Sequence, residues 1–390
     1  MDFNLEPKYL AIQQETLELC RSIEHLADEA DASSVIHPGI LKALQKSNLS
    51  DLMVPAKYGG RFETIDPLAI CVAREAMMAT SSHLDSLFAL QGIGSYGITV
   101  AGSEKQRQQW LPKVAIAQSL PSLGLTEPVA GSDLKSIVTE ITSVDGGLRL
   151  NGAKSWISNA GASDFYAIFA KEGSTFSMVL VPADRAGVSV KPSPKIIAPH
   201  VLGEVTFDNV ILSEEDRLGS LGQGMELTLA TLSVFRVSVA GAAVGLAQAA
   251  LEEATRHTRS RVQFGRPLSR LGPVAQMLAD SWVEIEMASR NDNSNGHRST
   301  SRPEAVPLSK KSGGGMTKKN SAKKNIMNKT KSRKMRPKKQ QAPIKKTVAQ
   351  QERRNKLKSI HAKRQSVDAL NAGKSASAEV VAEQERGVDA

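Results

Sequence analysis

The first stretch able to do chemistry is GLTEPVAGSD at residues 124–133. Two glycines permit close backbone approach or positive φ, a proline fixes φ and removes a donor, and two residues add hydroxyls. These residues are Gly124 and Gly131, Pro128, and Thr126 and Ser132. The turn can also present backbone N–H groups to an anion or a heteroaromatic edge. Taken alone, the decapeptide is more typical of an ordinary domain-crossing loop, so its meaning depends on the rest of the chain.

A second stretch of similar style, NGAKSWISNAG at 151–161, follows in sequence, and RVQFGRPL at 261–268 adds arginine and a glycine turn. No other catalytic pattern competes with them. The seven histidines (25, 37, 83, 200, 257, 297 and 361) have no metal-ligand spacing, and GxSxG is absent from the chain. The short GQG at 222–224 is too brief to indicate a phosphate loop. Because the histidines lack metal-ligand spacing, we expect no metal site.

The elements that must position these residues occur in the order helices, strands, helices. Helical spacing of apolar residues dominates residues 1–120, and short β-branched and aromatic runs fill residues 121–217. The DGG break at 145–147 predicts a hairpin within the second region. Helical spacing returns over residues 218–290. The sequence therefore predicts an α+β protein with an N-terminal helical domain, a middle β-sandwich or barrel, and a partial C-terminal helical bundle.

The last hundred residues differ from the rest in charge and composition. Residues 291–390 hold 25 of the 50 lysines and arginines, only 8 of the 40 acids, and none of the 16 aromatics. Their net charge of +17 contrasts with −7 for residues 1–290. Such a segment cannot bury enough apolar surface to offset its ordering entropy, so we expect a disordered basic tail. Binding of nucleic acid or acidic partners, solvated disorder without a partner, a natural fusion and a faulty gene model all stay open for this tail.

Cysteine usage and targeting signals bear on the compartment. Cys20 and Cys71 have no CxxC spacing and lie in helical patterns, which favours reduced thiols and an intracellular protein. The N-terminus lacks a basic region followed by an apolar run. The most apolar stretch, 237–251, falls short of the ~20 residues that span a bilayer. We expect a soluble protein without a membrane span, in the cytoplasm first, with mitochondrion and peroxisome as alternatives.

The long motifs, considered together, resemble a known family. GLTEPVAGSD, NGAKSWISNAG, the VTFDNV strand and RVQFGRPL occur in the order and spacing of the acyl-CoA dehydrogenases, which are FAD-dependent flavoproteins. The resemblance covers residues 1 to about 290. It implies α,β-dehydrogenation of an acyl-CoA thioester, with removal of the α-proton by a carboxylate and transfer of the β-hydride to the flavin.

The resemblance assigns roles to one wall of a flavin site. Leu123, Leu125 and Thr126 belong to the segment that lines the flavin, with the last two at the isoalloxazine edge. Ser132 matches a position near the pyrophosphate and the acyl-CoA.

A matching strand packs on the other side of the flavin in the family. Trp156, Ile157 and Ser158 match this strand. Family members usually have threonine at the last position, and serine keeps the hydroxyl that faces flavin N5. Arg236 matches the arginine on the substrate side.

The third motif implies contact between subunits. Arg261, Gln263 and Phe264 resemble the segment that grips the dinucleotide of a neighbouring subunit, where an arginine can neutralise pyrophosphate. The resemblance thus implies a homo-oligomer with FAD as cofactor. It also implies an acyl-CoA substrate and an electron-accepting flavoprotein or another oxidant as partner.

The chain departs from the family at the catalytic base. The usual glutamate lies in a late YEGT-like segment, and residues after 290 contain nothing similar. A minority of members carry it one residue before the arginine, where this chain has Phe235. Glu226, Glu252 and Glu253 are on the same predicted helix, but no sequence signal places them at the site. The base therefore stays unassigned. The shortened bundle exposes a face that needs a partner, or else the chain folds poorly.

Two functions follow from these observations. The first is an acyl-CoA dehydrogenase-like enzyme impaired by loss of its usual base region. The second is a non-catalytic flavoprotein scaffold whose basic tail binds nucleic acid or acidic partners.

Overall fold

A computed structural model describes residues 5–193 and 200–300, and for residues 290–300 it describes the backbone alone. The expectations for a basic tail beyond residue 300 lie outside these ranges. The first ten residues of the predicted tail continue the last helix, which runs through Gly272–Thr300.

The N-terminal region is helical, as expected. Its α-helices are α1 (Pro7–Ile23), α2 (Ala27–Ala32), α3 (Pro38–Ser47), α4 (Pro67–Thr80), α5 (Ser82–Ala101) and α6 (Glu104–Ala115). Proline begins three of them, where its missing N–H costs nothing. Asp66 caps α4, and Ser103 forms a capping box with Gln106 at the start of α6. Local sequence signals therefore define where these helices begin.

The middle region forms one eight-stranded sheet in the order β6-β7-β3-β2-β4-β5-β8, with β1 paired to β4. The strands are β1 (Pro121–Gly124), β2 (Glu140–Val144), β3 (Gly147–Ser158), β4 (Phe165–Glu172), β5 (Thr175–Pro182), β6 (Val188–Pro192), β7 (Leu202–Leu212) and β8 (Arg217–Leu218). The predicted hairpin joins β2 and β3, and Gly146 at its turn has φ of 82°. The sheet is mixed rather than purely antiparallel, because β1 and β2 pair in parallel with β4.

Strand β4 is buried on both faces and separates two cores. Phe165, Ala167 and Phe169 point into the core shared with the helices. The alternate residues, among them Tyr166 and Ile168, point into a second core made of side chains from the strands and their loops. The sheet therefore covers its second face by its own curvature, as in barrel-like sheets.

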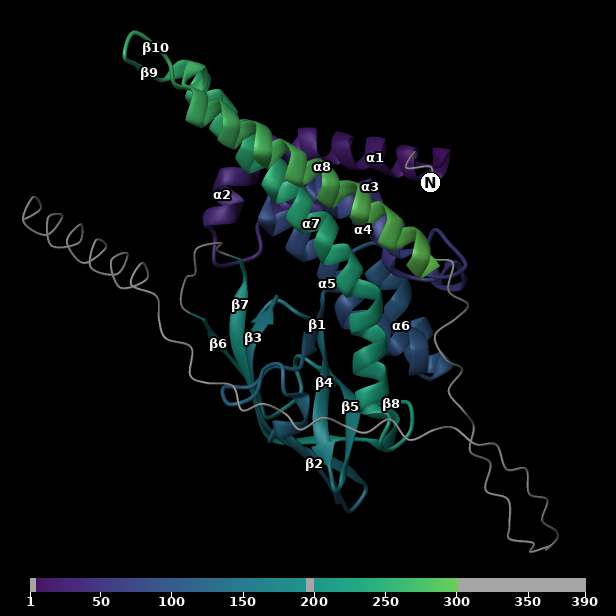
Figure 1. The fold of residues 1–390 in the computed structure, drawn as a ribbon. Coiled ribbons are helices and arrows are strands. Elements are labelled where there is room, and N and C mark those ends of the chain that lie inside the picture. The colour runs from purple at the N-terminus through teal and green to yellow at the C-terminus, as the bar shows by residue number, and fades with distance from the viewer. Residues whose placement is uncertain (1–4, 194–199, 301–390) are drawn as a thin grey trace, which may run out of the picture. The chain divides into compact units, whose positions relative to one another are not determined.

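The C-terminal part is a long helical hairpin. Helix α7 (Gly224–Ser260) is followed by the two-residue strands β9 (Val262–Gln263) and β10 (Arg266–Pro267), and then by α8 (Gly272–Thr300). Figure 1 shows β9 and β10 at the far end of this hairpin, away from the sheet. The expected order of helices, sheet and helices is confirmed.

Helix α7 packs closely on α4 at a glycine. A Cβ on Gly245 would lie 1.9 Å from the backbone oxygen of Glu75, so only glycine allows the two helices to approach this closely. By length and composition α7 could also cross a membrane, but core helices of soluble proteins can have the same length and composition. Its N-terminal part packs against α4, α5 and strand β5.

A buried ion pair ties three helices together. Arg74 on α4 donates from Nε and Nη2 to the carboxylate of Asp85 on α5, at 2.8 and 2.6 Å. Its Nη1 donates to Ser238 Oγ on α7 at 3.0 Å. All three residues are buried, so this network fixes α7 on the N-terminal helices.

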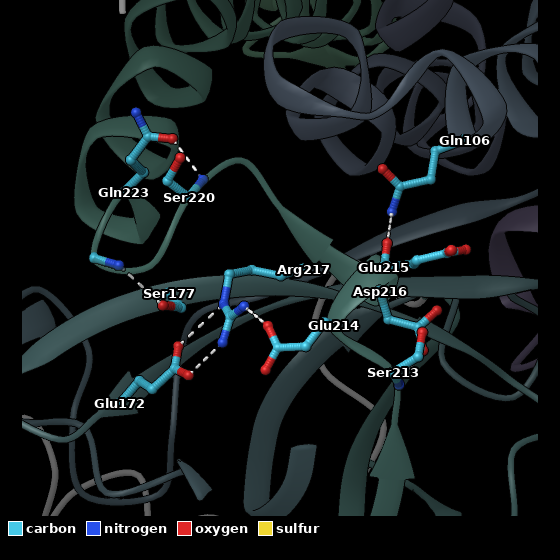
Figure 2. A network of polar contacts seen from close by, with 11 residues as sticks. Gln106, Glu172, Ser177, Ser213, Glu214, Glu215, Asp216, Arg217, Ser220 and Gln223 are labelled. Carbon is cyan, nitrogen blue, oxygen red and sulfur yellow. Dashed lines mark hydrogen bonds and ion pairs between the residues drawn. The ribbon is translucent and has the colours of Figure 1, made fainter. Parts of the chain in front are cut away.

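A second polar network joins the sheet to α6 and to the turn before α7 (Figure 2). Arg217 on β8 contacts Glu214 and donates to Glu172 at the end of β4, with an Nη2–Oε1 distance of 2.6 Å. Gln106 of α6 donates to the backbone oxygen of Glu215 at 2.8 Å. In the turn before α7, the Gly222 N–H donates to Ser177 Oγ at 3.2 Å. These contacts hold α6 and the start of α7 against the sheet.

Candidate cofactor-binding site

The loop of the first motif is held by a buried ion pair. Lys154 on β3 donates from Nζ to Glu127 Oε1 at 2.7 Å and to the backbone oxygen of Leu125 at 3.2 Å. The side chains of Lys154 and Glu127 are both 0% exposed. The Ser155 N–H adds a bond of 2.8 Å to the backbone oxygen of Thr126. Residues 125–127 are therefore fixed against β3.

Glu127 has further partners that keep it ionised. Its carboxylate accepts from the N–H groups of Val138 and Thr139 at 2.7 and 3.0 Å. Burial alone would raise the pKa of Glu127, but the bonds from Lys154 and from these two N–H groups lower it overall. The carboxylate thus joins both ends of the loop that carries Ser132.

A β-bulge displays Trp156 beside this loop. The register between β3 and β7 shifts between Lys154 and Ile157, and Trp156 lies in the bulge with φ of 59°. Its side chain is 55% exposed, whereas Ile157 is buried in the second core. Of the predicted strand, Trp156 and the half-buried Ser158 are thus the residues with side-chain surface available to a ligand.

The strand end after the bulge is tied to β1. Ser122 Oγ donates to the backbone oxygen of Ser158 at 2.6 Å and lies 2.5 Å from Ser163 Oγ. Asn159, buried at φ of 61°, has an amide Nδ2 without a hydrogen-bond partner within the described residues. The exposed indole of Trp156, the half-buried hydroxyl of Ser158 and the unsatisfied amide donor of Asn159 fit a planar, polar-edged cofactor.

The remaining residues of the predicted wall belong to β1 and to the loop that follows it. Leu123 and Leu125 are partly buried against the helical core, and Thr126 is partly exposed. Ser132 is exposed in the loop, and a Cβ on the neighbouring Gly131 would meet no atom within 4 Å. The loop therefore leaves open space beside Ser132.

A row of histidines extends from Ser158 into the helical domain. Ser158 Oγ lies 3.4 Å from His200 Nε2. His83 is buried, and its Nε2 accepts from the His37 N–H at 3.0 Å, which requires a neutral ring with the proton on Nδ1. Burial lowers the pKa of His83, against the opposing effect of Asp31. Within residues 5–193 and 200–300 no cluster of His, Cys, Asp and Glu could hold a metal ion.

The pKa of His83 predicts acid sensitivity. The unfolded chain takes up this proton near pH 6.5 while the folded chain resists it, so stability is full above that pH and falls below it. The loss should be at most about 1.4 kcal/mol per pH unit. The free energy of unfolding of His83→Gln, measured with denaturant, should change less between pH 7 and pH 5 than that of the parent. His25→Gln, which replaces an exposed histidine, should keep the parental slope, and equal slopes for all three proteins would contradict the assignment.

Around Arg236, α7 provides a cation but no carboxylate. Arg236 is exposed and has no hydrogen bond or ion pair to another described residue. Phe235 before it is buried, with its ring 5.6 Å from that of Tyr96 in an edge-to-face contact. A Cβ on Gly92 would lie 2.5 Å from the Phe235 ring, so the aromatic side chain fills this position completely.

The third motif lies apart from the wall. Arg261, Gln263 and Phe264 are exposed at the β9–β10 turn, and Phe264 is 88% exposed at φ of 56°. Figure 1 places this turn at the opposite end of α7 from the sheet. The structure thus brings residues 123–126 close to 156–158, leaves Ser132 exposed in the loop that follows, and places Arg261, Gln263 and Phe264 elsewhere.

Sequence reasoning missed Glu127, Lys154 and Asn159. Each lies inside a quoted motif, but polar and charged side chains are usually expected to face solvent. The available signal was the lysine within an alternating strand, at a position whose neighbours Leu148 and Leu150 are buried.

Comparison with known proteins defines the class. Three family models match the chain in order: the acyl-CoA dehydrogenase N-terminal domain over residues 7–118, the middle domain over 122–210 and the C-terminal domain over 222–292. Fold, motifs and domain order therefore define a three-domain dehydrogenase.

Individual relatives agree with these models. A probable acyl-CoA dehydrogenase of Mycobacterium tuberculosis is 32% identical over 67% of this chain and 69% of its own length. Glutaryl-CoA dehydrogenase of Desulfococcus multivorans is 30% identical over 74% of this chain and 77% of its own. The solved butyryl-CoA dehydrogenase of Megasphaera elsdenii superposes with a TM-score of 0.71 at 29% identity, covering 78% of this chain and 82% of that one. The chain belongs to the acyl-CoA dehydrogenase family.

Proposed function

We propose that Leu123, Leu125, Thr126, Ser132, Trp156, Ile157 and Ser158 form one wall of an FAD site. The observation that carries this proposal is the exposed Trp156 on its bulge, beside a loop held by the buried Glu127–Lys154 pair. Solved relatives support it, since a glutaryl-CoA dehydrogenase of Mycobacterium smegmatis, 25% identical with a TM-score of 0.70, was determined in complex with FADH2. The wall belongs to the domain 121–217, between the helical domains 1–120 and 218–290.

The residues of the wall have distinct tasks. The Trp156 indole offers a face for stacking, and the hydroxyls of Thr126 and Ser158 offer hydrogen bonds to the edge of the ring system. The Ile157 side chain faces the core, so only its backbone can take part. FAD, when bound, supplies the hydride-accepting chemistry of an acyl-CoA dehydrogenase.

Substrate contacts come from the loop and from α7. Ser132 presents a hydroxyl and Arg236 an unpaired guanidinium, which suits the phosphates of an acyl-CoA. A solved relative described as a glutaryl-CoA dehydrogenase in complex with glutaryl-CoA supports a thioester ligand at 27% identity and a TM-score of 0.70.

Dehydrogenation by this chain is impaired in our proposal, because within the described residues no carboxylate of α7 stands at the alternative position of the family's base. Phe235 is buried at the position where a minority of relatives carry the base. Glu226 is exposed at the start of α7. Glu252 and Glu253 lie beyond Gly245 on the distal part of the helix, and Glu253 pairs with Arg256 at 2.5 Å. Without a base the α-proton stays on the thioester, and hydride transfer is slow.

Partners follow from the same family membership. In our proposal the exposed Arg261, Gln263 and Phe264 contact the dinucleotide of a neighbouring copy, and the working form is a homo-oligomer. A solved structure described as an electron-transferring flavoprotein of Acidaminococcus fermentans, 25% identical with a TM-score of 0.72, supports a flavoprotein as electron acceptor. We place the protein in the cytoplasm, as expected from its sequence.

The proposal is tested by mixing purified protein with acyl-CoA esters of different chain lengths under anaerobic conditions. We expect yellow protein whose flavin absorbance bleaches about 100-fold or more slowly than that of the butyryl-CoA dehydrogenase of Megasphaera elsdenii, the usual range for loss of a general base. Rapid bleaching would contradict the impairment but retain the flavin site. Colourless protein that takes up no FAD would overturn both.

The second candidate is a non-catalytic flavoprotein scaffold, favoured by Phe235 at the alternative base position. The +17 charge of residues 291–390 would then bind nucleic acid or an acidic partner. This tail has no aromatics to stack on bases, so binding should be blind to sequence and fall steeply with salt. Salt-independent binding of the full chain to RNA or DNA would contradict this candidate.

A further inference from the structure

Ser158 and His200 lie opposite each other at one end of the β3–β7 strand pair. The two strands pair as far as Ser158, and one residue further the Asn159 N–H donates to the backbone oxygen of Val201 at 2.9 Å. The backbone oxygen of Ser158 also accepts from Ser122 Oγ at 2.6 Å. These bonds hold the backbone on both sides of the contact, in which Ser158 Oγ lies 3.4 Å from His200 Nε2.

The contact limits what the Ser158 hydroxyl can do. A serine hydroxyl has one proton to donate and two lone pairs that accept. An unprotonated imidazole nitrogen can accept that proton, whereas a charged imidazole only donates. When His200 is charged, its Nε2 therefore donates to Ser158 Oγ, and the proton of Ser158 is left for another acceptor. The charge of His200 thus decides where the Ser158 hydroxyl donates.

The titratable groups around His200 come from the helical domain. Burial is the main cause that lowers the pKa of His83, and Asp31 of α2 opposes it. Charges on His37 and His200 would lower the pKa of His83 further. His37 itself lies 3.7 Å from Glu29, measured from Nε2 to Oε1. His200 is half-buried and contacts the proposed flavin wall, so at mildly acidic pH it takes up a proton more easily than the buried His83.

We propose that His200 is a positioning residue that controls the Ser158 hydroxyl at the flavin wall. Uncharged His200, with its proton on Nδ1, accepts from Ser158, and the hydroxyl then turns its lone pairs to the cofactor. Charged His200 donates to Ser158, and the hydroxyl proton becomes available to acceptor atoms on the edge of the flavin ring. Histidine side chains change charge between about pH 5 and 8, so pH tunes this site. The inference rests on the FAD site proposed above.

The first test measures the FAD affinity of the full-length protein at about pH 8 and about pH 5.5, the two sides of histidine titration. We expect the affinity to be about 5-fold higher at the acidic pH, the effect of one hydrogen bond. His200→Leu leaves the hydroxyl free at every pH, so its affinity should equal that of the acidic parent at both. Ser158→Ala should bind weakly at both. A His200→Leu variant that binds FAD more weakly than the parent at every pH would show a merely structural role and overturn the proposal.

Two further variants separate His200 from the other histidines. His25→Gln changes an exposed histidine of the N-terminal helices, and His83→Gln removes the buried neighbour. Both should keep the pH dependence of the parent. A pH dependence that disappears in His83→Gln would overturn the proposal while the flavin site stands. Equal FAD affinity of the parent at both pH values would do the same.

The second test needs no FAD. Nitrogen NMR of the histidine-labelled protein without FAD reports which ring nitrogen carries a proton, and His200 is assigned by the signal that His200→Leu loses. We expect an unprotonated Nε2 at the alkaline pH, whose signal moves in Ser158→Ala. The signal should stay in place in Ser132→Ala, which removes an exposed hydroxyl of the loop.

The outcomes of the second test separate the contact from the cofactor. An Nε2 signal that Ser158→Ala does not move, or a proton on Nε2 at the alkaline pH, would overturn the role of His200 whether or not the chain binds FAD. A protein that shows the contact but takes up no FAD would overturn the flavin site, and with it the role of His200 there.

Discussion

Lys154→Met should destabilise the protein by about 3–5 kcal/mol and release the loop that carries Ser132. The substitution leaves the Glu127 carboxylate buried with no cation, since the Lys154 and Glu127 side chains are both fully inaccessible. The bonds from Val138 and Thr139 remain, but they do not neutralise its charge. Denaturant unfolding measures the loss of stability. FAD titration measures how much the release of the loop weakens FAD binding.

The surface pair of Lys105 and Glu215 supplies the matched control. Its Nζ–Oε2 distance is 2.8 Å, close to that of the buried pair, but both side chains are about three-quarters exposed. Lys105→Met should therefore have no measurable effect. Similar losses in the two variants would show that burial of the Glu127–Lys154 pair is not what stabilises the loop.

Asp85→Asn is expected to cost about 3–5 kcal/mol for a related reason. It removes the only carboxylate that contacts Arg74 within the described residues, and leaves a buried guanidinium between α4, α5 and α7. Because Arg74 also holds Ser238 of α7, the hairpin should loosen from the N-terminal helices. Thermal unfolding followed by hydrogen exchange in α7 would show both effects.

Ser238→Ala separates the ion pair from the helix contact. It removes one hydrogen bond to Arg74 Nη1 and retains the charge pair, so the expected cost is about 1–2 kcal/mol. A larger loss for Ser238→Ala than for Asp85→Asn would contradict the central role of the buried charge.

Local signals predicted the order of the elements well. The glycine turn between β2 and β3 and the long helical pattern after residue 224 are properties of short segments, which periodicity and turn chemistry encode. Pairing direction is not local. Nothing in the run 121–124 indicates that β1 lies parallel to β4, because partner choice depends on packing against the helices.

Residues of the candidate site divide in the same way. Trp156 and Ser158 could be named from their motif, but the bulge that exposes Trp156 depends on the register between β3 and β7. The pairing of Glu127 with Lys154 spans 27 residues of sequence and arises only when the loop folds onto β3. The distance of Arg261 from the wall follows from the length of α7 and could not be predicted from the motif alone.

The most direct test of the flavin site is the amount of FAD bound per chain after purification and reconstitution with excess FAD. We predict one FAD per chain by absorbance, with affinity lowered about 5-fold or more in Trp156→Ala, since stacking contributes about 1 kcal/mol or more. Val190→Ala, at an exposed position on β6, should bind like the parent. A folded chain that binds no FAD, or binds it equally well without Trp156, would contradict the proposed flavin wall.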